Sequence, residues 1–175
     1  MRIGIIGGGA AGMAAAIAAS EYDNIHITLM ERQARLGKKL SATGNGRCNL
    51  SNIHAAQGGY HGDDPHFHEY ALSQYPPEET LQWFRDLVYP YSDQANSVVD
   101  VLRFSLNCFN TQVLTDFEVM KVKKDGSKFV VTSKDRTLEF DRLIIACGGL
   151  AGTKLGGTMS GYKLLRSFGH KCTKL

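Results

Sequence analysis

The sequence predicts an α/β fold with a parallel sheet and an antiparallel β-hairpin insertion. Residues 1–6 and 25–30 are apolar and contain several isoleucines, and an alanine-rich helical segment joins them. Residues 142–146 form a third apolar segment, typical of a parallel strand covered on both faces. Before it, Asp125-Gly126 separates two alternating segments, which predicts a hairpin. This order of elements favours a dinucleotide-binding, Rossmann-like domain.

The elements expected along the chain follow from periodicity and helix caps. The first part should contain strand 1–6, helix 10–21, strand 25–30, a single helical turn in 33–40, an irregular segment 41–62, and helices 67–75, 78–87 and 92–108. Pro77 suits the first turn of helix 78–87, and Ser92 suits the N-cap of the next helix. The second part should contain strands 112–115, 118–123, 128–133, 137–140 and 142–146, then helix 161–169.

Length and composition predict one domain over residues 1–175. The net charge of +3 is too small to indicate a polyanionic partner, and no apolar run reaches the ~18 residues that cross a bilayer. The four cysteines lack C-x-x-C or zinc-type spacing, which favours a reduced, cytoplasmic protein. We therefore expect no nucleic acid, membrane or metal as partner, and the oligomeric state stays open. His66 and His68, near Asp63 and Asp64, have metal-ligand chemistry but a poor spacing.

A glycine-rich turn at residues 7–12 (GGGAAG) follows the first strand and opens the first helix. In a G-x-G-x-x-G motif the first glycine permits the tight turn, and the second lets backbone approach a pyrophosphate. The third allows close packing of helix on strand. The helix N-terminus then offers free N–H groups to phosphate. Glu31 ends the second strand, where an acid accepts hydrogen bonds from ribose hydroxyls, so FAD or NAD is favoured over NADP.

A second glycine-punctuated segment, residues 37–52, begins soon after this acid. Its glycines permit positive φ angles and close approach of a ligand, and its arginine can neutralise a diphosphate. Its threonine and asparagines supply hydrogen-bond donors and acceptors. A surface loop with an incidental arginine has the same composition, but the position beside a dinucleotide motif favours cofactor binding. The residues with these properties are Thr43, Gly44, Asn45, Gly46, Arg47 and Asn49.

Residues 37–52 resemble the signature of the BaiN/YhiN-like flavoproteins, FAD-binding oxidoreductases of the aminoacetone-oxidase type. Further segments extend the resemblance over essentially the whole chain: 88–95, 143–149, 156–162 and 168–170. The chain departs from the family at Met159-Ser160, where the family has Gly-Asp, and at Cys147, where it has Thr. The first departure removes a carboxylate from that loop, whereas the second is nearly isosteric.

The resemblance implies FAD as cofactor. It places the pyrophosphate on the glycine motif, the adenosine ribose on Glu31 and adenine against the backbone near Val119. The segment after Lys39 would wrap the diphosphate and approach the flavin. The implied cofactor-binding residues are Gly7, Gly9, Ala10, Ala11, Gly12, Glu31, Arg32, Lys39, Thr43, Gly44, Asn45, Gly46, Arg47, Cys48, Asn49, Val119, Gly148 and Gly149.

The resemblance also implies a function, the nucleotide-binding portion of an FAD-dependent oxidoreductase that acts on an unknown small molecule. The family's β-rich substrate domain and its flavin-covering C-terminal segment would lie outside these residues. No side chain stands out as a catalytic acid or base. Two alternatives stay open, an NAD-binding dehydrogenase domain and a non-catalytic FAD-binding fragment. Cys48 could serve as a redox thiol beside the flavin, although a lone cysteine is more often a small packed residue.

Overall fold

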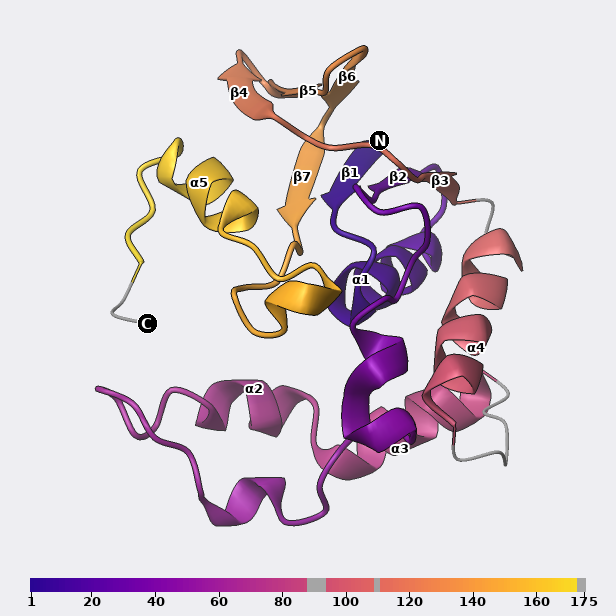
Figure 1. The fold of residues 1–175 in the computed structure, drawn as a ribbon, viewed down its shortest axis with the longest axis vertical. Coiled ribbons are helices and arrows are strands. Elements are labelled where there is room, and N and C mark those ends of the chain that lie inside the picture. The colour runs from indigo at the N-terminus through magenta and orange to yellow at the C-terminus, as the bar shows by residue number, and fades with distance from the viewer. Residues whose placement is uncertain (88–93, 109–110, 173–175) are drawn as a thin grey trace.

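The computed structural model describes residues 1–87, 94–108 and 111–172 (Figure 1). A four-stranded parallel sheet, in the order β3-β2-β1-β7, forms its centre. Its strands are β1 (Arg2–Ile6), β2 (His26–Met30), β3 (Gln112–Leu114) and β7 (Arg142–Ile145). A separate antiparallel sheet contains β4 (Lys121–Asp125), β5 (Lys128–Thr132) and β6 (Thr137–Phe140).

Helices lie in the connections from β1 to β2 and from β2 to β3, whereas the antiparallel sheet lies between β3 and β7. α1 (Ala10–Ser20) joins β1 to β2. The long connection from β2 to β3 contains η1 (Leu40–Gly46), η2 (Ala55–Gln57), α2 (Glu69–Gln74), α3 (Pro77–Asp86) and α4 (Ala95–Cys108). After β7 come η3 (Thr153–Leu155) and α5 (Ser160–Arg166). Figure 1 shows α2 and α3 at the opposite end of the molecule from the antiparallel sheet. None of the helices in the described ranges could span a membrane.

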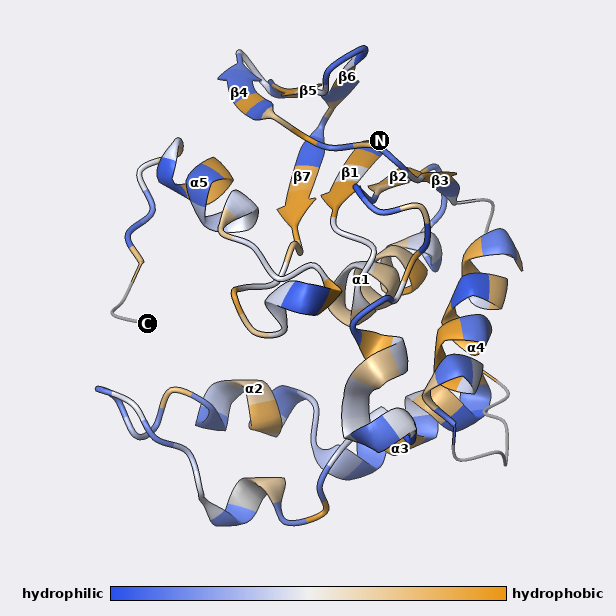
Figure 2. Ribbon diagram, viewed as in Figure 1, coloured by the Kyte–Doolittle hydropathy of each residue, from blue (hydrophilic) through white to orange (hydrophobic). Residues whose placement is uncertain are grey.

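The first face of the parallel sheet packs against helices. Successive side chains of a strand point to opposite faces, so Ile3 and Ile5 of β1 share one face. They are buried together with Met13 of α1 and Leu102 of α4. Figure 2 shows β1 and β7 as largely hydrophobic strands. Burial on both faces holds for β1, but the prediction of a fully covered strand at 142–146 is wrong, because β7 lies at the edge of the sheet and Ile144 is 37% exposed.

The second face packs against the antiparallel sheet through Phe140, whose side chain is 1% exposed. A Cβ on Gly4 would lie only 2.7 Å from the Phe140 ring, so glycine in β1 makes room for this ring. Ile6 belongs to the same buried cluster. The guanidinium of Arg2 lies 5.7 Å from the ring centroid, within reach of a cation–π interaction.

The structure confirms the predicted α/β class, the parallel sheet and the antiparallel insertion. At the predicted hairpin turn Gly126 has φ +54°. A turn in which the Ser41 N–H donates to the Gly37 carbonyl (2.9 Å) matches the helical turn predicted in 33–40. The strand predicted at 118–123 begins later, at Lys121. Before it, the Phe117 N–H donates to the Glu31 carbonyl beside β2 (2.9 Å), and the Met120 N–H donates to the Thr132 carbonyl of β5 (2.9 Å). Ser92, the predicted N-cap, and the family-like segment from residue 88 to 93 lie outside the described residues.

Asp141 ties the junction of β6 and β7 to strand β1. Its carboxylate accepts hydrogen bonds from the Arg2 backbone N–H (2.6 Å) and from the Lys128 ammonium. The hydrogen bond from Lys128, followed by that from Arg2, lowers the pKa of Asp141 from 3.8 to about 2. The folded state therefore favours the ionised form of this carboxyl group.

We predict that Asp141→Asn lowers the melting temperature by a few degrees at pH 7. A carboxyl group whose pKa is depressed by folding stabilises the protein above its unfolded pKa, and this contribution is lost as the pH falls from about 4 to about 2. The difference in melting temperature between wild type and variant, followed by circular dichroism, should shrink over that range. Asp135→Asn, in the exposed turn between β5 and β6, is the control and should leave stability unchanged. A difference independent of pH would contradict this assignment.

Candidate functional site

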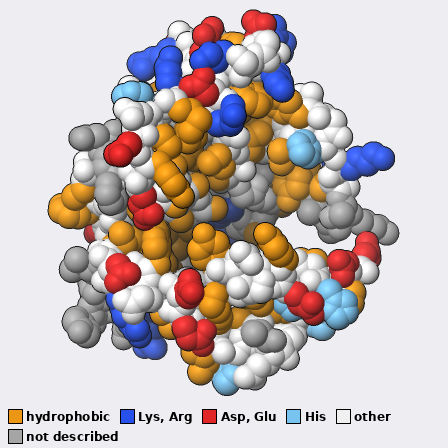
Figure 3. Space-filling model, turned by 180° about the vertical axis from the view of Figure 1, so that it is seen from behind, with side chains coloured by type: hydrophobic (Ala, Val, Ile, Leu, Met, Phe, Trp, Pro, Cys, Tyr) orange, Lys and Arg blue, Asp and Glu red, His pale blue; other side chains and the backbone are white. Residues whose placement is uncertain are grey.

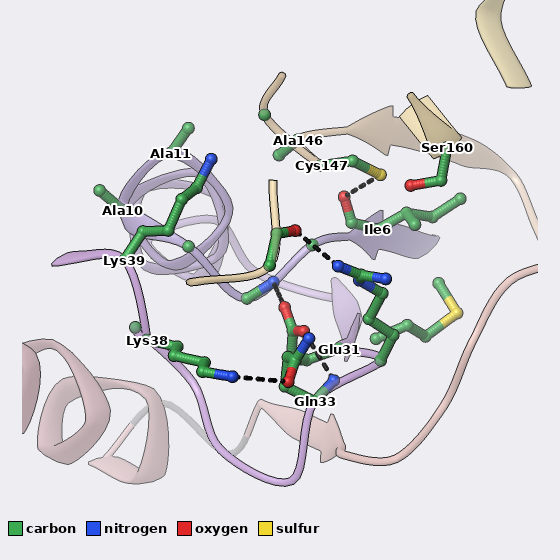
Figure 4. A pocket seen from close by; sticks show the side chains of 18 of the residues that line it. Ile6, Ala10, Ala11, Glu31, Gln33, Lys38, Lys39, Ala146, Cys147 and Ser160 are labelled. Atoms are coloured by element: carbon green, nitrogen blue, oxygen red, sulfur yellow. Dashed lines mark hydrogen bonds between the residues drawn. The ribbon is translucent and has the colours of Figure 1, made fainter. Parts of the chain in front are cut away.

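A pocket of about 330 Å³ opens at the carboxyl ends of the parallel strands (Figure 4). Ile6 at the end of β1, Met30 at the end of β2 and Ala146 after β7 all line it. It lies at the switch point of the sheet, because β2 and β7 flank β1 on opposite sides. Open α/β sheets bind ligands at such a point. Seen from behind, the molecule is hollowed, and hydrophobic side chains gather around the hollow (Figure 3).

The three glycines of the motif meet three different requirements. Gly7 has φ +112°, and its N–H donates to the Met30 carbonyl (2.8 Å). A Cβ on Gly12 would lie 1.8 Å from the Gly7 carbonyl oxygen, so only glycine lets α1 pack on this turn. At Gly9, which lines the pocket, no atom lies within 4 Å of such a Cβ. Gly9 caps α1 without a side-chain hydrogen bond, so the first N–H groups of the helix can bind an anion.

Glu31 connects the glycine turn to the wall of the pocket. One carboxylate oxygen accepts a hydrogen bond from the Gly8 N–H (2.7 Å), and the other accepts one from the Gln33 N–H (2.8 Å) (Figure 4). Each carboxylate oxygen can accept two hydrogen bonds, so both retain a position for a ribose hydroxyl. Glu31 therefore has a structural task in addition to its predicted contact with the cofactor.

The charge of the pocket favours an anionic ligand. Among the described residues only two carboxylates line it, those of Glu31 and Glu118, against twice as many cationic side chains. Lys38 and Lys39 point in different directions, so the positive charge is spread along the wall (Figure 4). The cationic lining residues are Arg32, Arg35, Lys38 and Lys39.

The loop predicted to wrap the diphosphate lies mostly outside this pocket. Lys39 and Thr43 line it, but the following residues bind one another instead, with the Arg47 N–H donating to the Gly44 carbonyl (3.0 Å). Positive φ angles, +53° at Asn45 among them, turn the chain back on itself. The contacts predicted for these residues with the cofactor therefore stay predictions. The residues of this loop that were predicted to bind the cofactor but do not line the pocket are Gly44, Asn45, Gly46, Arg47, Cys48 and Asn49.

Most of the other predicted residues line the pocket, and their contacts with a cofactor stay predictions. The structure places Gly12 in helix packing rather than at the pocket, and Gly149 against Tyr162, whose oxygen would be 3.0 Å from a Cβ there. The predicted residues that line the pocket, besides Glu31, Lys39 and Thr43, are Gly7, Gly9, Ala10, Ala11, Arg32, Val119 and Gly148.

Sequence reasoning missed part of the lining. Some missed residues directly follow Glu31 or precede Val119, so proximity in sequence could have indicated them. Those from η3 and α5 come close only through tertiary packing, for which no local pattern exists. The main missed residues are Gln33, Arg35, Lys38, Phe117, Glu118, Cys147, Leu155, Gly156, Ser160 and Leu164.

Neither cysteine near the site has the environment of a reactive thiol. Burial, followed by the negative charge of Glu31, raises the pKa of the Cys147 thiol from 9.0 to about 11. Its Sγ lies 3.5 Å from the Ile6 carbonyl oxygen. A protonated thiol is a poor nucleophile. Cys48 is 8% exposed and packs in the core with the α1 residues, which favours the packed residue over the redox thiol.

The histidine pair has contacts of its own. His66 Nδ1 lies 2.6 Å from the Glu69 carboxylate, and the His68 ring stacks on Tyr60 with centroids 3.8 Å apart. No group of three or more potential metal ligands occurs in the part of the chain that the structure describes.

Comparison with known protein families shows to which family the chain belongs. The family described as HI0933-like protein Rossmann domain matches residues 1–175. The chain belongs to this family. Membership confirms the predicted resemblance and, with it, a Rossmann domain of the type that binds FAD.

Two curated proteins resemble the HI0933-like domain along nearly its whole length. The 3-dehydro-bile acid delta(4,6)-reductase of Clostridium scindens is 42% identical over 97% of the chain. The ribosomal RNA dihydrouridine synthase of Escherichia coli is 32% identical over 94% of the chain. The chain spans 44% of the length of each of these proteins.

Solved structures share the fold of the HI0933-like domain. The 3-ketosteroid-delta4-(5alpha)-dehydrogenase from Rhodococcus jostii matches with a TM-score of 0.63 and 15% identity, over 85% of this chain and 46% of its own. Thioredoxin reductase from Streptococcus pyogenes matches with a TM-score of 0.51 and 22% identity, over 83% of this chain and 34% of its own. At these identities the similarity establishes the fold alone.

We predict different effects of alanine at two motif glycines. Gly12→Ala should lower the free energy of unfolding by about 1–3 kcal/mol, because its Cβ forces α1 away from the Gly7 carbonyl. Gly9→Ala should change it by less than about 0.5 kcal/mol, since the space is open and its φ of −82° suits alanine. Urea denaturation measures both values. Equal destabilisation by the two variants would contradict this reading of the motif.

We also predict that Cys147 resists alkylation. At pH 8 and without flavin, iodoacetamide should modify the exposed Cys108 well before Cys147, whose thiol ionises only near pH 11. Mass spectrometry of peptides over a time course measures both rates. Modification of Cys147 at the rate of Cys108 would show that its thiol is neither buried nor protonated.

Proposed function

We propose that this chain is the FAD-binding domain of a flavin-dependent reductase that saturates a conjugated carbon–carbon double bond in a small molecule. The observation that carries the FAD-binding part of the proposal is the open space beside Gly9. Cationic side chains line it, and so does Glu31, whose carboxylate oxygens keep free acceptor positions. This arrangement suits the ADP half of a dinucleotide with an unmodified ribose.

The residues present fit that half of FAD. The diphosphate would lie at the N-terminus of α1, where Gly9 leaves room for its oxygens and Lys39 supplies positive charge. The ribose would bind Glu31, and adenine would lie against the backbone near Val119. The isoalloxazine ring would extend beyond the pocket, toward the loop of residues 44–49. The predicted contacts of this loop would then be with the flavin end of the cofactor.

The proposed chemistry rests on two relatives with different substrates. One is named for reduction of a bile acid at delta(4,6), and the other for synthesis of dihydrouridine in ribosomal RNA. Both names describe saturation of a carbon–carbon double bond. In such a reaction reduced FAD would supply the hydride and an acid or solvent the proton, and a reductant such as a reduced nicotinamide would reduce the oxidised flavin again. The higher identity to the bile acid reductase favours a small conjugated ketone as substrate over RNA.

The proposal extends to domain organisation. Residues 1–175 would form one FAD-binding domain, and the substrate-binding wall would lie in further residues such as those that the two longer relatives contain. A cytoplasmic location is consistent with the free thiols of Cys48, Cys108 and Cys147. The two alternatives make different predictions. An NAD-binding domain would bind NADH but retain no flavin, and a non-catalytic fragment would hold FAD that no substrate reoxidises.

The proposed reaction can be tested with the complete gene product loaded with FAD and reduced anaerobically with dithionite. A steroid carrying a 3-keto-4,6-diene should reoxidise the flavin, which the recovery of its visible absorbance measures. Uridine-containing RNA should leave the flavin reduced. Reoxidation by RNA alone would assign the other substrate class, and reoxidation by neither would reject a double-bond reductase. A protein that retains no flavin would reject FAD binding itself.

We predict that Glu31→Gln weakens FAD binding roughly tenfold, because an amide provides one acceptor oxygen where the carboxylate provides two. Glu118→Gln is the matched control, since Glu118 also lines the pocket but is exposed. Quenching of flavin fluorescence in a titration measures both affinities. Equal losses in the two variants would indicate a general effect of charge rather than a ribose contact.

A further inference from the structure

Arg32 joins two parts of the pocket wall that are far apart in the sequence. It follows Glu31 after β2, and its Nη2 donates a hydrogen bond of 2.5 Å to the carbonyl oxygen of Gly156. Both residues line the pocket. In dinucleotide-binding folds an arginine near the ribose acid can accommodate a 2′-phosphate. Here its guanidinium instead binds the backbone of the opposite wall.

Residues 148–157, which we call the clasp, form a tightly wound segment after β7. The N–H groups of Leu155 and Gly157 both donate to the Gly152 carbonyl, at 2.9 and 3.1 Å. A Cβ on Gly157 would lie 2.5 Å from the Ala151 carbonyl oxygen, so the turns are closely stacked. Because the backbone groups of the clasp bind one another, a contact at one residue orients the whole segment.

Gly156 has the conformation that the contact with Arg32 requires. Its φ of +103° lies in a region that residues with side chains rarely adopt. A Cβ at this position would lie 3.1 Å from Gln33 Nε2 and 3.3 Å from Arg32 Nη2. These two atoms end flexible side chains that can yield slightly, so the φ angle is the main obstacle to a larger residue at this position.

A second, longer contact reaches the clasp from the other side of the pocket. Lys39 Nζ lies 3.4 Å from the Ala151 carbonyl oxygen, and a Cβ on Gly148 would lie 3.1 Å from the same Nζ. Short hydrogen bonds from a charged donor are the stronger ones. The Arg32 contact therefore contributes more than the Lys39 contact to the position of the clasp.

We propose that Arg32 is a positioning residue that holds the clasp against the adenosine half of the bound dinucleotide. The inference rests on the proposed binding of FAD and adds a role for a residue that does not itself need to touch the phosphates. Arg32 raises the affinity for ligands that contain adenosine diphosphate. It gives no preference for a 2′-phosphate, because its guanidinium is bound to Gly156.

The test compares affinities of the complete gene product for FAD, ADP and 2′,5′-ADP by isothermal titration calorimetry. Arg32→Met keeps the length of the side chain but removes the donor, and should weaken FAD and ADP roughly tenfold. Arg32→Lys retains one donor and should recover part of this loss. Arg136→Met is the control, because Arg136 carries the same charge but is exposed and lies outside the residues that line the pocket. It should change either affinity less than about threefold.

A second variant tests the contact rather than the residue. Gly156→Ala should weaken ADP binding through the strained φ angle, and the double variant Arg32→Met/Gly156→Ala should be no weaker than the worse single variant. Hydrogen exchange supplies a readout apart from affinity. The peptide that spans the clasp should be protected by ADP in the wild type and much less so in Arg32→Met, with unchanged exchange in β1.

The outcomes separate this inference from the proposed function. Unchanged ADP affinity in Arg32→Met would overturn the positioning role while leaving FAD binding intact. A larger loss for 2′,5′-ADP than for ADP would show that Arg32 binds a 2′-phosphate, and would also overturn it. Equal losses in Arg32→Met and Arg136→Met would reduce the effect to the net charge of the protein. A wild-type protein that binds neither FAD nor ADP would reject the proposed function together with this inference.

Discussion

The contact between Gly12 and the Gly7 carbonyl is the constraint on which the pocket depends. No side chain fits there, so α1 lies directly on the turn that leaves β1 and directs its N-terminus into the pocket. The neighbouring Gly8 then hydrogen-bonds to two other segments of the pocket wall, one at Glu31 and one at Gly37. Its N–H donates to the Glu31 carboxylate (2.7 Å), and its carbonyl accepts from the Gly37 N–H (2.8 Å). Displacing α1 would therefore disturb the phosphate and ribose sides together.

The opposite face of the sheet builds the remaining wall. Phe140 packs on Gly4 and anchors the antiparallel sheet, and β7 follows directly and delivers Ala146 to the pocket. The segment between β3 and β4 continues beside β2, with the Asp116 N–H donating to the Gln33 carbonyl (3.1 Å). This pairing brings Val119 to the pocket. The antiparallel insertion thus shapes the site as well as covering the sheet.

Patterns local to the chain predicted most of the fold, because strand and helix periods are local properties. The parallel strands, the turn at Gly126 and the glycine motif all carry such patterns. No local pattern predicts the orientation of the loop at residues 44–49, because its composition is the same whether Arg47 faces a ligand or solvent. The role of Arg32 was equally hidden. Arg32 donates to the backbone carbonyl of Gly156, which lies far along the chain. Every residue has a backbone carbonyl, so no sequence pattern predicts which one accepts this hydrogen bond.

The site separates cofactor binding from substrate choice. The glycine motif, Glu31 and the clasp are the parts that we propose bind the nucleotide half of a dinucleotide, and among the described residues of the pocket we assign no catalytic acid, base or nucleophile. Cys147, the one thiol that lines the pocket within the described ranges, is held protonated by its burial. Two relatives that resemble this chain over 94–97% of its length are named for unrelated substrates, a bile acid and a ribosomal RNA. If the two relatives share this nucleotide-binding domain but act on different substrates, their substrate specificity must arise in other parts of those longer proteins. The domain positions the cofactor, and the surfaces that face the flavin ring select the substrate.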